Sequence, residues 1–123
     1  MGHAAKINFV PENVTLALYA GDGANILIKV KDPTGNAVPL DGTVEAQVRN
    51  ERADTTALAD FQIDLTDAAT GQVRVWLTGV ETAALINGED PFSGFWDVQW
   101  TSPTAEPVTL VQGKATCTRD VTR

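Results

Sequence analysis

The sequence near the C-terminus alternates between apolar and polar residues, and this alternation constrains the fold more than any other feature. In the segment 94–101, every second residue is large and apolar, namely Trp96, Val98 and Trp100. A period of two is the pattern of a β-strand with one buried face. The segment 107–118 has the same character, and turn-forming residues separate the two. We therefore predict a hairpin whose aromatic face lies at the centre of the core.

Shorter segments with the same alternation recur along the chain, separated by clusters of Gly, Pro, Asp and Asn. They are 14–19, 26–30, 43–49, 61–65 and 73–77. The pattern predicts an all-β protein, an immunoglobulin-like antiparallel β-sandwich of about seven to eight strands. A jelly-roll or up-and-down barrel stays possible, because periodicity does not reveal strand order. One helical turn at most is expected, near residues 80–86.

The length fits one domain, and the inward positions of the strands predict its core. A chain of 123 residues can bury a core without disulfides or a metal. We expect residues 1–123 to form a single domain, with a short extended piece at 6–10 after a flexible terminus at 1–6. The predicted core residues are Trp96, Val98, Trp100, Ile26, Ile28, Val30, Phe61, Ile63, Val73 and Val75. Gly113 interrupts the last strand, which indicates a bulge or a close backbone approach.

Charge and hydropathy exclude two classes of partner. The net charge is −7, and the nine basic residues are scattered rather than clustered. Affinity for nucleic acid rests largely on Lys and Arg that neutralise phosphates, so we expect no nucleic-acid partner. No apolar run approaches the length that a membrane-spanning helix needs, and we expect no membrane partner.

The residue types that catalysis or metal binding needs are scarce. His3 is the only histidine and lies in the predicted flexible terminus, and Cys117 is the only cysteine, at an inward position. One Cys and one His exclude a structural zinc site. Asp64 and Asp97 alternate onto outward faces and are expected to be solvated, and the turn carboxylates lack the spacing of an EF-hand. The sequence therefore predicts no enzyme, no cofactor and no metal site.

An outward tryptophan is the main candidate for a functional surface. If Val73, Val75 and Leu77 point inward, Trp76 points outward beside Arg74. Tryptophan and arginine are enriched at interface hot spots. Leu27, also outward, gives weaker support for an interface. Two alternatives stay open: a loop or the N-terminus covers Trp76 within the monomer, or Trp76 stacks on a sugar ring.

The order of the motifs resembles one family of phage proteins. The matching segments are 18–22, 30–42, 67–77, 94–100 and 110–123, of which the last contains Gly113 and ends in Asp-Val-Thr-Arg. Together they are similar to the immunoglobulin-like domain at the N-terminus of phage baseplate upper proteins, which also occurs in small phage virion proteins. Each segment alone is a generic strand-and-turn signal, and the specificity lies in their order over nearly the whole chain.

The resemblance implies a structural role and offers no catalytic residues. It implies a virion protein of the tail, tail tip, baseplate or connector region, made in the host cytoplasm and assembled with other virion proteins or with copies of itself. Larger relatives continue past this domain, whereas the sequence stops at Arg123, so we expect a small component. The alternative is a capsid-surface decoration or a module that binds carbohydrate on the host surface.

Overall fold

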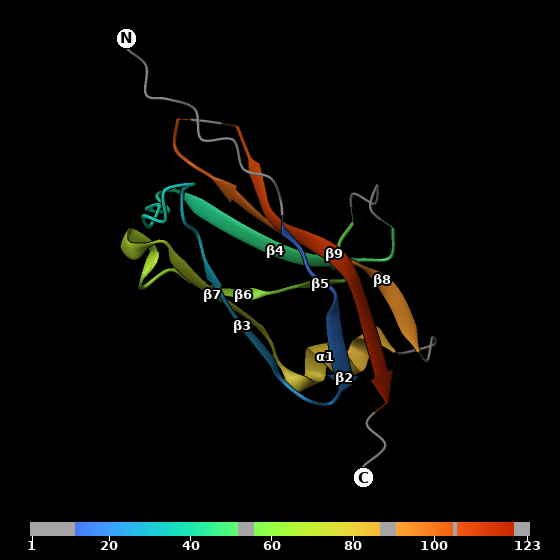
Figure 1. Cartoon of the computed structure of the whole chain (residues 1–123). Helices are drawn as coiled ribbons and strands as arrows, with labels where there is room; N and C mark the ends of the chain where they lie inside the picture. Colours follow the sequence, from blue (N-terminus) through green and yellow to red (C-terminus); the bar gives the residue numbers. More distant parts are fainter. Residues whose placement is uncertain (1–11, 52–55, 87–90, 105, 120–123) are drawn as a thin grey trace.

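Two β-sheets face each other in the computed structural model, which describes residues 12–51, 56–86, 91–104 and 106–119 (Figure 1). These residues form nine strands, one short α-helix and one 3-10 turn. The extended piece and the flexible terminus that we expected within residues 1–10 lie outside the described residues.

The larger sheet has six strands and contains the predicted C-terminal hairpin. Its strands are β1 (Glu12–Asn13), β2 (Leu16–Ala20), β4 (Thr43–Arg49), β5 (Ala59–Asp60), β8 (Phe92–Thr101) and β9 (Val108–Arg119). The order is β1-β9-β8-β4-β5, and β2 also pairs with β9. Strands β1 and β2 run parallel to β9, and all other pairs in this sheet are antiparallel.

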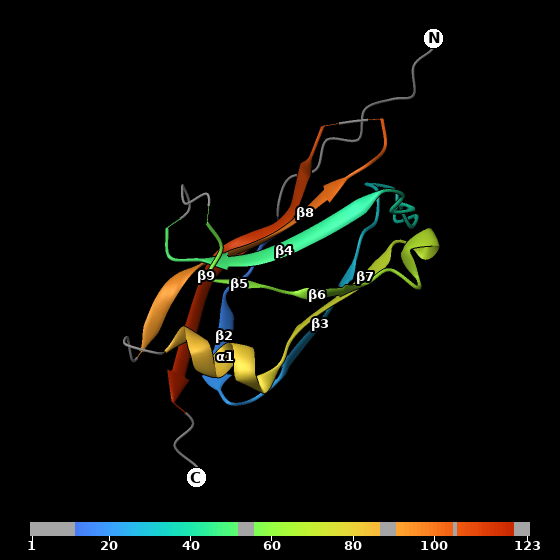
Figure 2. The same cartoon turned by 180° about the vertical axis from the view of Figure 1, so that it is seen from behind.

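The smaller sheet has three antiparallel strands, β3 (Ala24–Lys29), β7 (Gln72–Leu77) and β6 (Gln62–Asp64), in the order β3-β7-β6. In chain order, β3, β6 and β7 fall in one sheet and β4, β8 and β9 in the other. This is the partition of strands B, D, E and C, F, G in an immunoglobulin fold. The two sheets are separate layers (Figure 2), so the predicted sandwich is confirmed and the barrels are excluded.

The space between the sheets holds the side chains that the alternation places inward. Trp96 is 3% exposed, and its ring lies 6.0 Å from that of Phe61 at an angle of 42°. Most of the predicted core residues are buried, namely Trp96, Val98, Ile28, Val30, Phe61, Val73 and Val75. The other three, Ile26, Ile63 and Trp100, are partly buried and pack against this core.

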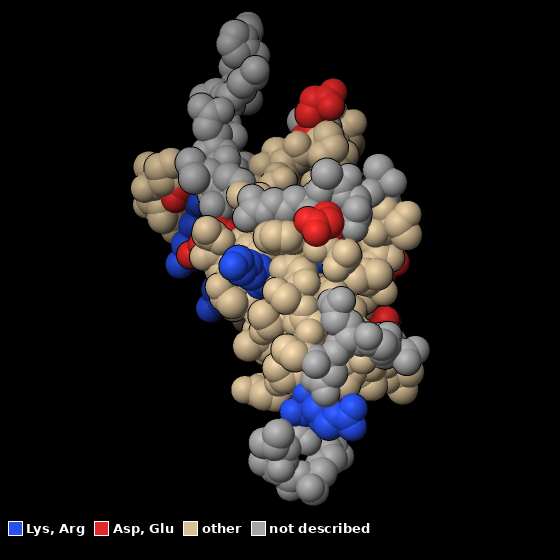
Figure 3. Space-filling view, turned by 90° about the vertical axis from the view of Figure 1, so that its right-hand side faces the viewer, with Lys and Arg blue, Asp and Glu red and all other residues tan. Residues whose placement is uncertain are grey.

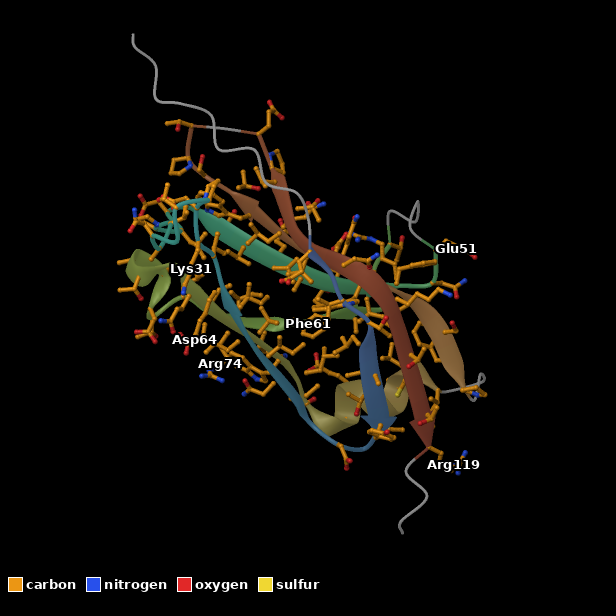
Figure 4. The ribbon with its side chains drawn as sticks, in the orientation of Figure 1. Lys31, Glu51, Phe61, Asp64, Arg74 and Arg119 are labelled. Carbon is orange, nitrogen blue, oxygen red and sulfur yellow. The ribbon has the colours of Figure 1, made fainter. Side chains whose placement is uncertain are left out.

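The predicted strand 61–65 is shorter in the structure, where it forms β6, and a strand of the other sheet, β5, comes directly before it. Strand β5 pairs with β4, whereas β6 pairs with β7, and Phe61 lies between them. Phe61 is buried, and its backbone N–H donates to the carbonyl of Ala46 at 2.9 Å. Phe61 therefore fixes the point where the chain crosses between the sheets, and Figure 4 shows its side chain directed into the interior.

Gly113 marks a close backbone approach, and the irregularity in register lies elsewhere. The register between β8 and β9 shifts between Val98 and Gln99. A Cβ atom on Gly113 would lie 2.1 Å from the carbonyl oxygen of Val14. Only glycine lets the segment between β1 and β2 lie this close to β9.

The helix expected near 80–86 is present and slightly longer than predicted. Helix α1 spans Gly79–Leu85, about two turns rather than one. Thr78 and Glu81 form a capping box, which satisfies backbone donors at its first turn. The hydroxyl of Thr82, fully buried, accepts from the N–H of Gly21 and donates to the carbonyl of Asp22. These bonds hold the helix against the β2–β3 turn. The second short helical segment, η1 (Ala68–Thr70), precedes β7 where a turn was predicted.

Candidate interaction surfaces

Trp76 lies on the outer face of the three-stranded sheet, as the alternation predicts. Across the strands it is paired with Asn25 on β3 and with Gln62 on β6. These polar neighbours leave its side chain half-buried. Trp76 is therefore neither a core residue nor a freely exposed one.

Arg74 and Leu27 lie on the same face, and we call these two residues with Trp76 the Trp76 face. Leu27 is paired with Arg74 and is 42% exposed. The Arg74 guanidinium donates to Asn25 Oδ1 at 2.7 Å. The structure therefore brings all three predicted interface residues together on two adjacent strands.

The carboxylate of Asp64 lies beside Arg74 at the edge of this face. The two residues are paired across β6 and β7, and Figure 4 shows their side chains close together. The pKa of Asp64 is lowered, first because the Thr66 hydroxyl donates to it at 2.6 Å, then because the Thr66 N–H donates at 2.8 Å. The positive charge of Arg74 lowers it further. As predicted from its outward position, Asp64 is partly exposed, but it has defined partners.

The Trp76 face is shallow. A depression of about 20 Å³ lies between Leu27, Asp64, Asp67, Gln72 and Arg74. A volume of this size has room for about one water molecule. The depression is therefore too small to enclose a sugar ring.

A second surface, on the outer face of the six-stranded sheet, was not predicted. Arg49 on β4 and Asp97 on β8 form an ion pair at 2.8 Å, and their side chains are only 18% and 24% exposed. Arg49 also donates to Gln47, whose amide donates to Asp60 at 2.7 Å. Asp97 is therefore part of a network across three strands and not the solvated strand residue that we expected.

A hollow of about 200 Å³ lies beside this ion pair, and we call it the Arg49–Asp97 hollow. It is lined by Arg49, Phe95, Trp96, Asp97, Gln99, Thr109, Gln112 and Gly113. The outward row of β8 was visible in the sequence, but its neighbours were not. The pairing of β4 with β8 brings together residues 48 positions apart, which periodicity alone does not indicate.

Cys117, one of the residues considered for chemistry, lies in the core. Cys117 is fully buried, and its thiol lies 3.4 Å from the carbonyl oxygen of Thr82. His3 lies outside the described residues. Among the residues that the structure describes, no three His, Cys, Asp or Glu side chains gather as metal ligands. The described part of the chain also contains no helix long and apolar enough to cross a membrane.

Comparison with known proteins identifies a fold and no closer relationship. No protein-family profile matches the sequence, and no curated protein matches it. Among solved structures, the chain is similar to domains 4 and 5 of the S-layer protein SbsC, with a TM-score of 0.50 and 14% identity over 90% of this chain. It spans 44% of that S-layer chain. The fold is immunoglobulin-like.

Two further solved structures resemble the chain more loosely. A mutant of the titin I27 domain has a TM-score of 0.48 and 12% identity, with 97% of this chain and 95% of that one covered. The heterodimer of the first immunoglobulin domains of ZIG-8 and RIG-5 has a TM-score of 0.41 and 13% identity, with 85% and 83% covered. At such identities the likeness is one of fold.

Proposed function

We propose that the chain is a non-enzymatic structural component of a bacteriophage virion, in the tail, the tail tip or baseplate, or the connector region. There it acts as an assembly module through contacts with other virion proteins or with copies of itself. The order of its sequence motifs, which resembles that of phage immunoglobulin-like domains, supports a location in the virion. The Trp76 face supports assembly by protein contact.

The observation that carries the assembly role is the Trp76 face itself. It joins a half-buried tryptophan, an arginine and an exposed leucine on two paired strands. Aromatic residues and arginine dominate the energy of protein interfaces, whereas charged residues such as Lys and Asp are depleted at their centres. A shallow face of this composition is suited to docking against another protein surface.

Incorporation into particles tests this proposal. The chain is produced in cells infected with a phage that carries its gene, and purified particles are analysed by mass spectrometry. We expect the wild-type chain in the particles and a loss of at least about tenfold for Trp76→Ala, since a hot-spot residue contributes about 2 kcal/mol or more. Tyr19→Ala is the matched control, because Tyr19 is a 54% exposed aromatic on the other sheet.

Three results would contradict the proposal. A chain that never enters particles is not a virion protein. Normal incorporation of Trp76→Ala would mean that the contact lies elsewhere, for example along an edge strand. Equal losses for Trp76→Ala and Tyr19→Ala would show that exposed aromatics in general, rather than this face, affect assembly. Circular dichroism melts of the purified variants verify that each one is folded.

The alternative is a module that decorates the capsid surface or binds carbohydrate on the host. The depression on the Trp76 face has room for about one water, so it is too small for a sugar ring. The alternative finds support elsewhere on the molecule, in the Arg49–Asp97 hollow.

A further inference from the structure

The Arg49–Asp97 hollow has the chemistry of a small-molecule site. We propose that it binds one ring of a neutral saccharide. This proposal does not depend on the virion role, since it concerns the opposite sheet and a different class of ligand.

The charge of the hollow favours a neutral ligand. Among the described residues that line it, Arg49 and Asp97 alone are charged, and they form an ion pair with each other at 2.8 Å. The carboxylate of Asp97 would repel a bound phosphate or carboxylate, and the guanidinium of Arg49 would repel a bound cation. An uncharged ligand can bind while the ion pair stays intact.

The polar side chains of the hollow suit a ligand that carries several hydroxyl groups. Gln99, Gln112 and Thr109 lie on adjacent strands, where Gln99 is paired with Thr109 and Asp97 with Gln112. Each of these uncharged side chains both donates and accepts hydrogen bonds. A hydroxyl group does the same, so a sugar ring offers a matching partner to each.

Two further groups strengthen the match. The Nε atom of Arg49 is buried and contacts no acceptor in the described part of the chain. A buried donor without an acceptor is unfavourable, and a ligand oxygen would remove that cost. Phe95 adds a half-buried aromatic ring to the lining, against which the C–H face of a sugar can pack.

The size of the hollow limits the ligand to one ring. Its volume of about 200 Å³ is below the range of roughly 300–1,000 Å³ typical of sites for drug-sized molecules. Figure 3 looks onto the side where β8 and β9 lie and shows mostly uncharged residues there, on a protein whose net charge is −7.

Nuclear magnetic resonance titration tests the site directly. The ¹⁵N-labelled chain is titrated with maltotriose, cellotriose and chitotriose as neutral probes and with a trigalacturonate as an anionic one. We expect at least one neutral probe to shift the side-chain amide signals of Gln99 and Gln112. The anionic probe is expected to bind more weakly.

Point variants distinguish binding in the hollow from binding at aromatic residues elsewhere on the surface. Gln112→Ala and Phe95→Ala should each weaken binding of the neutral probe by about fivefold or more, as expected for one lost hydrogen bond or packing contact of about 1 kcal/mol. Tyr19→Ala and Trp76→Ala should bind as the wild type does. Gln99→Ala is the second polar variant, used if Phe95→Ala does not give a native amide spectrum.

The proposal is overturned if no neutral probe shifts the hollow signals, or if the shifts map to Trp76 or Tyr19. Tighter binding of the anionic probe overturns it as well, and so does unchanged affinity in both Gln112→Ala and the second variant tested. None of these results bears on incorporation into particles. A Trp76→Ala variant that binds sugar normally but fails to enter particles would support the two proposals separately.

Discussion

Trp96 and Trp76 are the same residue type in the middle of two well-paired strands, yet their surroundings are opposite. Trp96 is paired with Val48 and Gly113, is 3% exposed, and donates its indole N–H to the carbonyl of Val14 at 2.8 Å. Trp76 is paired with two polar residues and is half-buried on the outer face. Residue type alone therefore does not decide where a tryptophan lies.

The difference follows from the neighbours along each strand. Trp96 alternates in step with Val98 and so belongs to the buried apolar row, whereas Val75 and Leu77 beside Trp76 form the apolar row themselves. Since successive side chains of a strand point to opposite faces, burial of Val75 and Leu77 places Trp76 outside. A tryptophan outside the core is free to serve a contact with another molecule.

The largest expected effect is the loss of stability on removal of Trp96. Trp96→Ala should lower the free energy of unfolding by about 3–5 kcal/mol, the usual range for truncation of a buried large aromatic. Total stabilities are about 5–15 kcal/mol, so this variant comes close to unfolding. Trp76→Ala should cost about 1 kcal/mol or less. Urea denaturation followed by circular dichroism measures both.

Equal costs for the two variants would contradict the comparison. They would mean that Trp76 is held as firmly as Trp96 and is a structural residue rather than a contact residue. The interface would then have to lie along an edge strand or elsewhere on the surface.

A smaller effect is expected at Gly113, which lies opposite Trp96. Gly113→Ala would place a Cβ 2.1 Å from the same Val14 oxygen that accepts the Trp96 indole bond. Relief of this clash has to move the backbone at Val14, at a cost of about 1–3 kcal/mol. Gly23→Ala is the control, because its nearest contact is an ordinary 3.5 Å. A Gly113→Ala variant as stable as Gly23→Ala would show that Val14 is not fixed against β9.

Most of the fold was predictable because its information is local. The alternation in 26–30, 43–49 and 73–77 gave strands close to β3, β4 and β7, and Val75 with Leu77 set the face of Trp76. The change of sheet at Phe61 was not predictable, because the two-residue strand β5 is too short to show an alternation. Only the pairing of β5 and β6 with different sheets reveals it.

The Arg49–Asp97 hollow was not predictable from the sequence, for a related reason. Both residues lie in outward rows, where the sequence indicates only solvent exposure. Their contact depends on the register of β4 against β8, in which Arg49 is paired with Phe95 and Gln47 with Asp97. Register between strands distant in sequence is a tertiary property, so a cluster built across it is visible only in the folded chain.

The smallest expected effect concerns the carboxylate beside the Trp76 face. The pKa of Asp64 is lowered first by the Thr66 hydroxyl, and the charge of Arg74 contributes less. Thr66→Val should therefore raise the pKa of Asp64 more than Arg74→Met does, as measured by carboxyl NMR titration. Because the folded-state pKa is lowered, the ionised Asp64 stabilises the fold above its unfolded pKa, and this contribution is lost as pH falls below about 4 through the folded value. The loss of stability in acid should shrink in the same order, so that Thr66→Val loses more of this pH dependence than Arg74→Met.

A larger rise in the pKa of Asp64 in Arg74→Met would instead show that Arg74 is held at Asp64 rather than at Asn25. The Trp76 face would then have a fixed charged border, less free to rearrange around a partner than the bond to Asn25 implies.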